Sequence, residues 1–250
     1  MLSKAQIKYI QSLQQKKLRH THYVYVIEGE KMMQEYLQSD YPLDNMYATE
    51  EWITENQTLL RKKKLTAVEV TTRELEQISS LTTPNKVVAL AKMQAIPSLK
   101  AMESLLVKGL HLALENIQDP GNLGTIIRTA DWFGVDSIIC SEDCVDAYNS
   151  KVVQATMGSL ARIKIYTTEL SSLFEKSPLP VYAATLEGEN IFNQKLLKDA
   201  IVLIGNESKG ISDELAQLAH KKISIPRFGK AESLNASVAA AVILALFRKG

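Results

Sequence analysis

The sequence has little of several residue types, and each shortage excludes a class of protein. Only two cysteines occur among 250 residues, Cys140 and Cys144, so we expect reduced thiols in a cytosolic protein rather than a disulfide framework. The longest apolar run, from Val238 to Phe247, is about half of the roughly 20 residues that a membrane-spanning helix needs. The N-terminus has no apolar block of the secretory kind. We therefore expect a globular, cytoplasmic protein.

The common nucleotide and catalytic fingerprints are also missing. Neither G-x-G-x-x-G nor G-x-x-x-x-G-K-[ST] occurs, since the polar loop at 116–124 offers only Gly121 and Gly124, and GNESKG at 205–210 places its lysine before the last glycine. This disfavours a standard nicotinamide or ATP site. The elbow G-x-S-x-G is absent, and the four histidines lie outside the polar loops described below, so we expect neither a histidine base nor a metal site.

Acidic residues are missing from one long stretch. Net charge is only +1, but residues 1–27 contain five basic residues and no acidic one, and RKKK follows at 61–64. Taken singly, such a run is more often a solvated helix face. Two runs in the same third of the chain predict a phosphate-binding surface. Its expected RNA-binding residues are Lys16, Lys17, Arg19, Arg61, Lys62, Lys63 and Lys64.

The first third of the chain alternates strand-like and helix-like segments. Strands are predicted near residues 23–27, 45–48, 65–70 and 86–91, and helices within 28–38 and 71–81, the latter with Thr72 as its N-cap. This pattern predicts a small α/β domain. A polar stretch after Pro97 marks the expected boundary, so the predicted domains are 1–97 and 98–250.

The rest of the chain predicts a larger α/β domain. Six short apolar runs, each followed by helical spacing, occur at 111–116, 136–140, 162–166, 179–185, 200–206 and 221–226. Such strands are typical of a doubly wound, mainly parallel sheet. Ligands bind beyond the carboxyl ends of the strands in these sheets. The unusual polar loops, at 116–124, 185–188, 205–210 and 226–235, all follow a predicted strand.

These loops and the helix that follows the first of them contain a small set of hydrogen-bonding residues. They are Asn122, Arg128, Asn206, Glu207, Ser233 and Asn235. Each also has a structural interpretation: Asn122 and Ser233 suit helix N-caps, and Arg128 is spaced to pair with Asp131. Because all of them are expected at one edge of the sheet, we interpret them together as a site.

Three stretches resemble a known family. NIQDPGNLGTIIRTADWFG, VLIGNESKGIS and ISIPRFGKAESLNASVAAAVILALF resemble, in order and spacing, the motifs of the SpoU (TrmH-like) RNA ribose 2′-O-methyltransferases of the SPOUT superfamily. The resemblance covers residues 108–250. The N-terminal third is similar, more loosely, to the L30e-like substrate-binding domain that often accompanies these enzymes, including its segment EGEKMMQEYL.

The resemblance implies several properties. The implied fold contains a deep trefoil knot that binds S-adenosylmethionine, and the implied assembly is a homodimer with each active site close to the interface. The implied substrate is RNA, with ribosomal RNA of the large subunit first and tRNA second. The implied catalytic residues are Asn122, Arg128, Glu207, Ser233 and Asn235. The implied cofactor-binding residues are Thr185, Leu186, Gly188, Ile204, Gly205, Ile225, Pro226 and Leu234.

Three residues, at two places in the chain, depart from the commonest family pattern, and two other functions remain as alternatives. Ser208 and Lys209 replace small or acidic residues, and Arg227 replaces an apolar residue after the proline. A non-catalytic RNA-binding protein with the same fold is one alternative, which the intact motif residues disfavour. A nicotinamide-dependent dehydrogenase is the other, which the missing glycine fingerprint disfavours.

Overall fold

The computed structural model describes residues 1–249, which form two units. The first contains Met1–Gln94 together with Asp146–Arg162, and the second contains Ala95–Val145 and the chain from Ile163 onward. The first boundary falls three residues before the predicted one at Pro97. The return of residues 146–162 to the first unit was not predicted, because nothing in the local pattern distinguishes this segment from the domain around it.

The first unit has a four-stranded sheet of order β1-β4-β2-β3. Strand β4 is antiparallel to both β1 and β2, whereas β2 and β3 are parallel. Strand β3 is shorter than the predicted 65–70, since only two of its residues pair with β2 and both are exposed. The strands are β1 (Val24–Glu28), β2 (Leu43–Ala48), β3 (Val68–Glu69) and β4 (Val87–Lys92).

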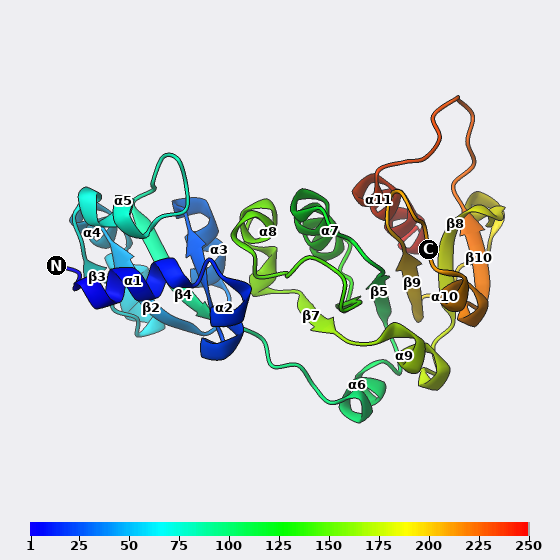
Figure 1. Ribbon diagram of the computed structural model, residues 1–250, viewed down its shortest axis with the longest axis horizontal. Helices are drawn as coiled ribbons and strands as arrows, with labels where there is room; N and C mark the ends of the chain where they lie inside the picture. The colour runs from blue at the N-terminus through cyan, green and yellow to red at the C-terminus, as the bar shows by residue number, and fades with distance from the viewer. Residues whose placement is uncertain (250) are drawn as a thin grey trace. The chain divides into compact units, whose positions relative to one another are not determined.

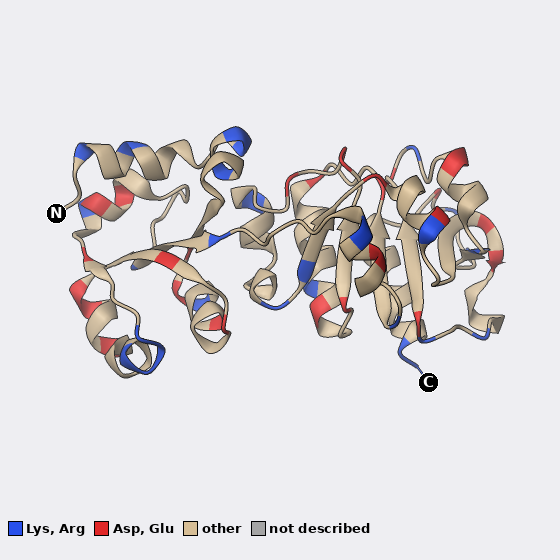
Figure 2. Cartoon of the chain, turned by 90° about the horizontal axis from the view of Figure 1, so that it is seen from below, with Lys and Arg blue, Asp and Glu red and all other residues tan. Residues whose placement is uncertain are grey.

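Five helices cover this sheet. Figure 2 shows α1, α2 and α5 on one side of the sheet and α3 and α4 on the other. Helix α5 begins with a capping box in which Thr71, not the predicted Thr72, accepts from the backbone of Glu74. The helices are α1 (Lys4–Ser12), α2 (Lys16–His22), α3 (Glu30–Gln38), α4 (Glu50–Lys63) and α5 (Thr72–Ile78).

The segment 146–162 completes the first unit with helix α8 (Ser150–Ala155) and the 3-10 helix η1 (Ser159–Ala161). The ring of Tyr148 packs on that of Tyr25, with centroids 4.7 Å apart. Gln154 donates to the carbonyl oxygen of Glu28 at 3.2 Å. Gly158, at φ +92°, lies so close to Glu35 that a Cβ would overlap its side chain. These contacts explain why the segment folds as part of the first unit.

The second unit confirms the predicted parallel sheet. Its six strands lie in the order β10-β8-β9-β5-β6-β7, and every neighbouring pair is parallel. Central strands β5 and β9 are buried along their whole length, as strands covered on both faces must be. The strands are β5 (Leu110–Leu114), β6 (Ser137–Cys140), β7 (Lys164–Thr167), β8 (Val181–Asn190), β9 (Ala200–Ile204) and β10 (Lys221–Ser224).

Helices cover both faces of this sheet (Figure 1). Helices α7 (Pro120–Trp132) and α11 (Ala236–Phe247) pack on each other over one face. Helices α6 (Leu99–Leu105), α9 (Leu170–Lys176) and α10 (Asp213–Leu218) cover the opposite face, where Met102, Leu173 and Leu215 join the apolar core. A 3-10 helix, η2 (Ile191–Asn193), follows β8. Among residues 1–249, no helix combines the length and apolarity needed to cross a bilayer.

Candidate active site

The strand order places the candidate site. From β5 the chain proceeds outward to β6 and β7, and then returns to the other side of β5 to form β9, β8 and β10. The order therefore reverses between β5 and β9. In doubly wound sheets the crevice for a ligand opens at this point, beyond the carboxyl ends of the strands. Asn122, in the first turn of α7 after β5, and Glu207, in the loop after β9, follow these two strands.

A hydrogen-bonded trio joins the first turn of α7, the loop after β9 and the N-cap of α11. The side-chain amide nitrogen of Asn122 donates to Glu207 Oε1 at 2.5 Å, and its oxygen accepts from Asn235 Nδ2 at 2.8 Å. Asn235 Oδ1 in turn accepts from the backbone nitrogen of Ser237 at 2.9 Å. Both ends of the Asn122 amide are therefore satisfied, so its orientation is fixed.

Helix capping explains why these side chains are available. Asp119, not Asn122, is the N-cap of α7, where it accepts from the Asn122 backbone at 2.7 Å and is followed by Pro120 at the first helical position. The Asn122 side chain is therefore left for the trio. The N-cap of α11 is Asn235, not Ser233.

The loop after β9 has a tight internal geometry. Asn206 Oδ1 accepts from the backbone nitrogens of Ser208 and Lys209, and its Nδ2 donates to the carbonyl oxygen of Asn116 at 2.8 Å. A Cβ on Gly205 would overlap the carbonyl oxygen of Gly210, so the residue here must be glycine. These bonds fix the position of Glu207 between its neighbours.

Asn116 is a site residue that the sequence did not indicate. It has φ +55°, a left-handed conformation that is uncommon for a residue with a side chain. Its Oδ1 is buried without a hydrogen-bond partner among residues 1–249. Asparagine tolerates the left-handed conformation better than most residues, so an asparagine at position 116 indicates it only weakly in the sequence.

The structure does not bring Arg128 and Ser233 into the trio. Arg128 is exposed on α7, about 9 Å along the helix axis from Asn122. Its side chain makes no hydrogen bond or ion pair with residues 1–249, so the pairing with Asp131 is not present. Ser233 is exposed and its hydroxyl makes no hydrogen bond within the described chain.

A pocket of about 780 Å³ lies beside the trio, beyond β8, β9 and β10. This volume is typical of small-molecule sites. Glu207 and Ser233 line it, which connects the trio to the pocket. Seven of the predicted cofactor-binding residues line it as well: Thr185, Leu186, Ile204, Gly205, Ile225, Pro226 and Leu234.

Two details of the pocket concern its fit to a ligand. Thr185 Oγ1 is buried and has no hydrogen-bond partner among residues 1–249, as expected for an atom that meets a polar ligand group. Gly188 is the predicted residue that does not line the pocket. A Cβ there would lie 2.5 Å from the carbonyl carbon of Ile223, so this glycine serves the close approach of β8 and β10 instead.

Cys144 supports the loop after β5 from behind. Both cysteines are free and buried. The Cys144 sulfur accepts from the Ile117 backbone nitrogen and donates to the carbonyl oxygen of Leu114, each at 3.3 Å. A hydrogen bond from Cys140 is the main cause that lowers the Cys144 pKa to about 7. Through its two backbone hydrogen bonds, the Cys144 thiol holds the start of the loop after β5 in position.

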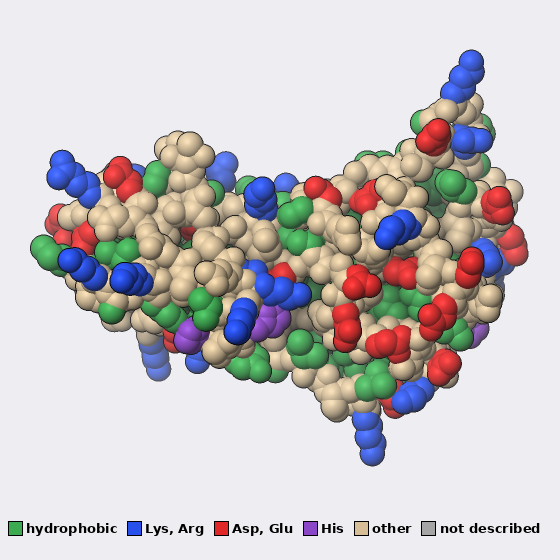
Figure 3. All heavy atoms as spheres, in the orientation of Figure 1, with side chains coloured by type: hydrophobic (Ala, Val, Ile, Leu, Met, Phe, Trp, Pro, Cys, Tyr) green, Lys and Arg blue, Asp and Glu red, His purple; other side chains and the backbone are tan. Residues whose placement is uncertain are grey.

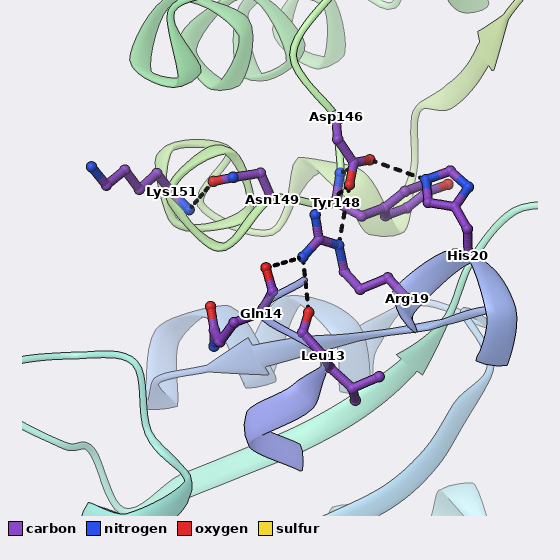
Figure 4. Close-up of polar contacts among 8 residues, drawn as sticks. All are labelled: Leu13, Gln14, Arg19, His20, Asp146, Tyr148, Asn149 and Lys151. Atoms are coloured by element: carbon purple, nitrogen blue, oxygen red, sulfur yellow. Dashed lines mark hydrogen bonds and ion pairs between the residues drawn. The ribbon is translucent and has the colours of Figure 1, made fainter. Parts of the chain in front are cut away.

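Arg19 was predicted to bind RNA, and the structure corrects this prediction. Its side chain is only 3% exposed. The guanidinium donates to Asp146 Oδ2 at 2.5 Å and to the carbonyl oxygens of Leu13 and Gln14 at 2.8 Å (Figure 4). With its donors directed at these groups, Arg19 is not available to a phosphate. Arg19 lies on the buried face of α2, whereas Lys16 and Lys17 are exposed. The run of basic residues in the sequence does not show this difference.

The two basic clusters do not form one surface within the first unit. Figure 2 shows α2 and the end of α4 on opposite sides of the sheet. Lys63 is held by the carbonyl oxygen of Ser39 at 2.7 Å and by Asp40 at 3.0 Å. The predicted residues that remain exposed are Lys16 and Lys17 on one side, and Arg61, Lys62 and Lys64 on the other.

The fold and site define an α/β domain with a pocket of small-molecule size beside a fixed polar trio. Comparison with known families matches residues 109–245 to the SpoU rRNA Methylase family and residues 4–89 to the MRM3-like substrate binding domain. The first match spans more than half of the chain. The protein belongs to the SpoU rRNA methylase family.

Full-length relatives agree with this assignment. The chain is 28% identical over 239 residues to the Bacillus subtilis 23S rRNA (guanosine(2553)-2′-O)-methyltransferase RlmP, covering 93% of this chain and 91% of that protein. It is similar to the structure of an AdoMet-bound rRNA methyltransferase from Sinorhizobium meliloti, with 27% identity, a TM-score of 0.87 and coverage of 100% and 96%. A TrmH-family structure from Porphyromonas gingivalis is 33% identical, with a TM-score of 0.86 and coverage of 100% and 99%.

Proposed function

We propose that this protein transfers a methyl group from S-adenosylmethionine to a ribose 2′-hydroxyl of ribosomal RNA. The observation that supports this most directly is the Asn122–Glu207–Asn235 trio, which joins three distant motifs of the SpoU family at the edge of the pocket. The relatives named above, one of which is described as AdoMet-bound, support the substrate and the cofactor.

The pocket residues fit the cofactor. The sulfonium of S-adenosylmethionine supplies an already activated methyl group, so the protein must align the acceptor oxygen and make it more nucleophilic. Backbone groups near Gly205, Ile225 and Leu234 would hold the cofactor. The unpartnered Thr185 Oγ1 would meet one of its polar groups. The trio then fixes the wall of the pocket at which the ribose enters.

Arg128 is assigned an electrostatic role. A guanidinium keeps its proton at any pH compatible with folding, so it is a poor general base. Its exposed position and lack of a partner among residues 1–249 leave it available to an anion from outside the chain. We assign it to the developing alkoxide or to a neighbouring phosphate, with proton removal by another group or by water.

The α7 and α11 surface supports a homodimer. Trp132 is 86% exposed and lies four residues after Arg128 on the same face of α7. On the adjoining α11, Val238 is 48% exposed. Apolar side chains on two packed helices favour contact with the same surface of a second copy. The substitution Trp132→Lys should convert a dimer to a monomer in light scattering, whereas Phe192→Lys, at another exposed aromatic residue, should not.

The remaining family properties are part of the same proposal. One of them is a C-terminal segment that threads through a loop to form a trefoil knot. A substrate in assembling ribosomes would place the protein in the cytoplasm.

Methyl transfer to RNA tests the proposal. Labelled S-adenosylmethionine would be incubated with the protein and total RNA from cells that lack it, and the RNA digested to nucleosides. We expect label in a 2′-O-methylated nucleoside of large-subunit RNA. Label in tRNA would show that tRNA, and not ribosomal RNA, is the substrate. Cofactor binding without label in free RNA would be followed by the same assay on ribosomal assembly intermediates. No label and no cofactor binding would favour a non-catalytic RNA-binding protein.

A further inference from the structure

Tyr23 has an unusual conformation at the end of α2. It is the C-cap of this helix, with φ 55° and ψ 37° in the left-handed region. Helices that end in this conformation usually have glycine there, because a side chain adds steric strain. The Tyr23 backbone donates to the carbonyl oxygen of Arg19 and accepts from Met93 at 2.8 Å. The backbone therefore requires the conformation, but nothing in it requires tyrosine.

The Tyr23 ring is not used within the chain. It is 65% exposed, and its hydroxyl makes no hydrogen bond with residues 1–249. A large exposed aromatic side chain at a strained position indicates that the ring has a use outside the fold. The question is which partner it meets.

The surroundings of Tyr23 are basic. Lys16 and Lys17 on α2 are exposed and form no ion pair with residues 1–249. His22 is exposed next to Tyr23, and its ring meets Tyr9 edge-on at 5.1 Å. Asp146, an acid packed against α2, is paired with Arg19. Figure 3 shows Lys, Arg and His side chains gathered over α2 on this face of the unit.

We propose that Tyr23 stacks on an unpaired base of the RNA substrate while Lys16 and Lys17 hold the adjoining phosphates. The inference rests on the proposed function and names the residues through which the first unit contacts RNA. Single-stranded nucleic acid offers both phosphates and exposed base faces, so it matches a cationic surface with a protruding aromatic ring. A protein partner would be expected to bury more apolar area than Tyr23 offers among these polar neighbours.

The substitution Tyr23→Gly separates this role from a structural one. Glycine suits the left-handed C-cap, so the melting temperature should stay the same or rise. Affinity for rRNA from cells that lack the protein, measured at fixed salt, should fall about 5-fold to 100-fold, which is the range for loss of one stacked base. Tyr23→Phe keeps the ring and should bind like the unsubstituted protein.

Salt dependence distinguishes the stacked base from the phosphate contacts. Tyr23→Gly should leave the slope of log Kd against log salt unchanged, whereas Lys17→Ala should reduce it by about one. Unchanged RNA affinity in Tyr23→Gly, or equal losses in Tyr23→Gly and Tyr23→Phe, would overturn the stacking role. Cofactor affinity and methyl transfer by the unsubstituted protein test the proposed function separately, so the failure of one is distinguishable from the failure of the other.

Discussion

Asn122 and Glu207 lie 85 positions apart in the chain and share a hydrogen bond of 2.5 Å. The direction of this bond matters, because the amide must donate to the carboxylate. Asn122 also accepts from Asn235, so a replacement must keep a donor on one side and an acceptor on the other. Asparagine meets both needs.

The polarity of this bond gives the first prediction. Asn122→Asp places two carboxylates together. This substitution should lower the free energy of unfolding by about 1–3 kcal/mol, and it should also lower the rate of methyl transfer. Adding Glu207→Gln restores a donor opposite Asp and should recover most of the lost stability. Urea unfolding of both variants measures this. Two independent, additive losses would show that the pair does not interact in solution.

Arg128 should be required for transfer but not for folding. Because its side chain has no partner among residues 1–249, Arg128→Ala should leave the melting temperature unchanged. If it stabilises charge in the transition state, the turnover number should fall about 100-fold to 1,000-fold while the Kd for S-adenosylmethionine is kept. Single-turnover kinetics and calorimetry separate the two effects. Near-normal turnover would remove Arg128 from the mechanism.

Two glycines at the pocket provide a matched comparison. A Cβ at Gly205 would overlap the carbonyl oxygen of Gly210, whereas one at Gly229 would meet nothing within 4 Å. Gly205→Ala should therefore cost about 1–3 kcal/mol in unfolding free energy and weaken cofactor binding. Gly229→Ala should change stability by less than about 0.5 kcal/mol. Equal effects of the two substitutions would contradict the described geometry of the loop after β9.

The sequence predicted the sheet of the second unit well because strand periodicity is a local signal. Strands β5 and β9 lie within one or two residues of their predicted bounds. The predicted group of six polar residues contains the trio, because polar loops after parallel strands meet at one edge, but the group also included Arg128 and Ser233, which do not join it. Burial that depends on distant segments was not predictable. Arg19 belongs to the same basic run as Lys17, but it is buried between the carbonyl oxygens of Leu13 and Gln14 and the distant Asp146.

The Arg19 and Asp146 pair gives a prediction about the stability of the first unit. Both side chains are less than 10% exposed, so removing one partner leaves an unpaired charge in the interior. Asp146→Asn should lower the free energy of unfolding by about 3–5 kcal/mol. Lys86→Ala removes the exposed partner of Glu51 and should leave the melting temperature unchanged. A loss in Asp146→Asn no larger than that in Lys86→Ala would mean that water reaches the pair.

His111 should make stability depend on pH below 6.5. Burial is the main cause that lowers its pKa, and the neutral ring accepts from Ser137 and donates to the carbonyl oxygen of Lys108. The unfolded chain therefore binds this proton at a higher pH than the folded chain does, so the free energy of unfolding falls as pH decreases through this range. Urea unfolding from pH 8 to 5 should show the decrease, and His111→Gln should reduce it. A His111 titration by NMR at or above 6.5 would contradict this account.

The assignment of residues 146–162 to the first unit changes how the two units are connected. The chain crosses between them after Gln94, after Val145 and again after Arg162. A protease that cuts near Pro97 would remove the covalent link between residues 1–97 and the rest of the chain. Residues 146–162, which stay joined to the second unit at both ends, still pack within the first unit, so the two fragments should stay together under native conditions. For the same reason, an exchange of substrate-binding domains between relatives requires this internal segment to move with residues 1–94.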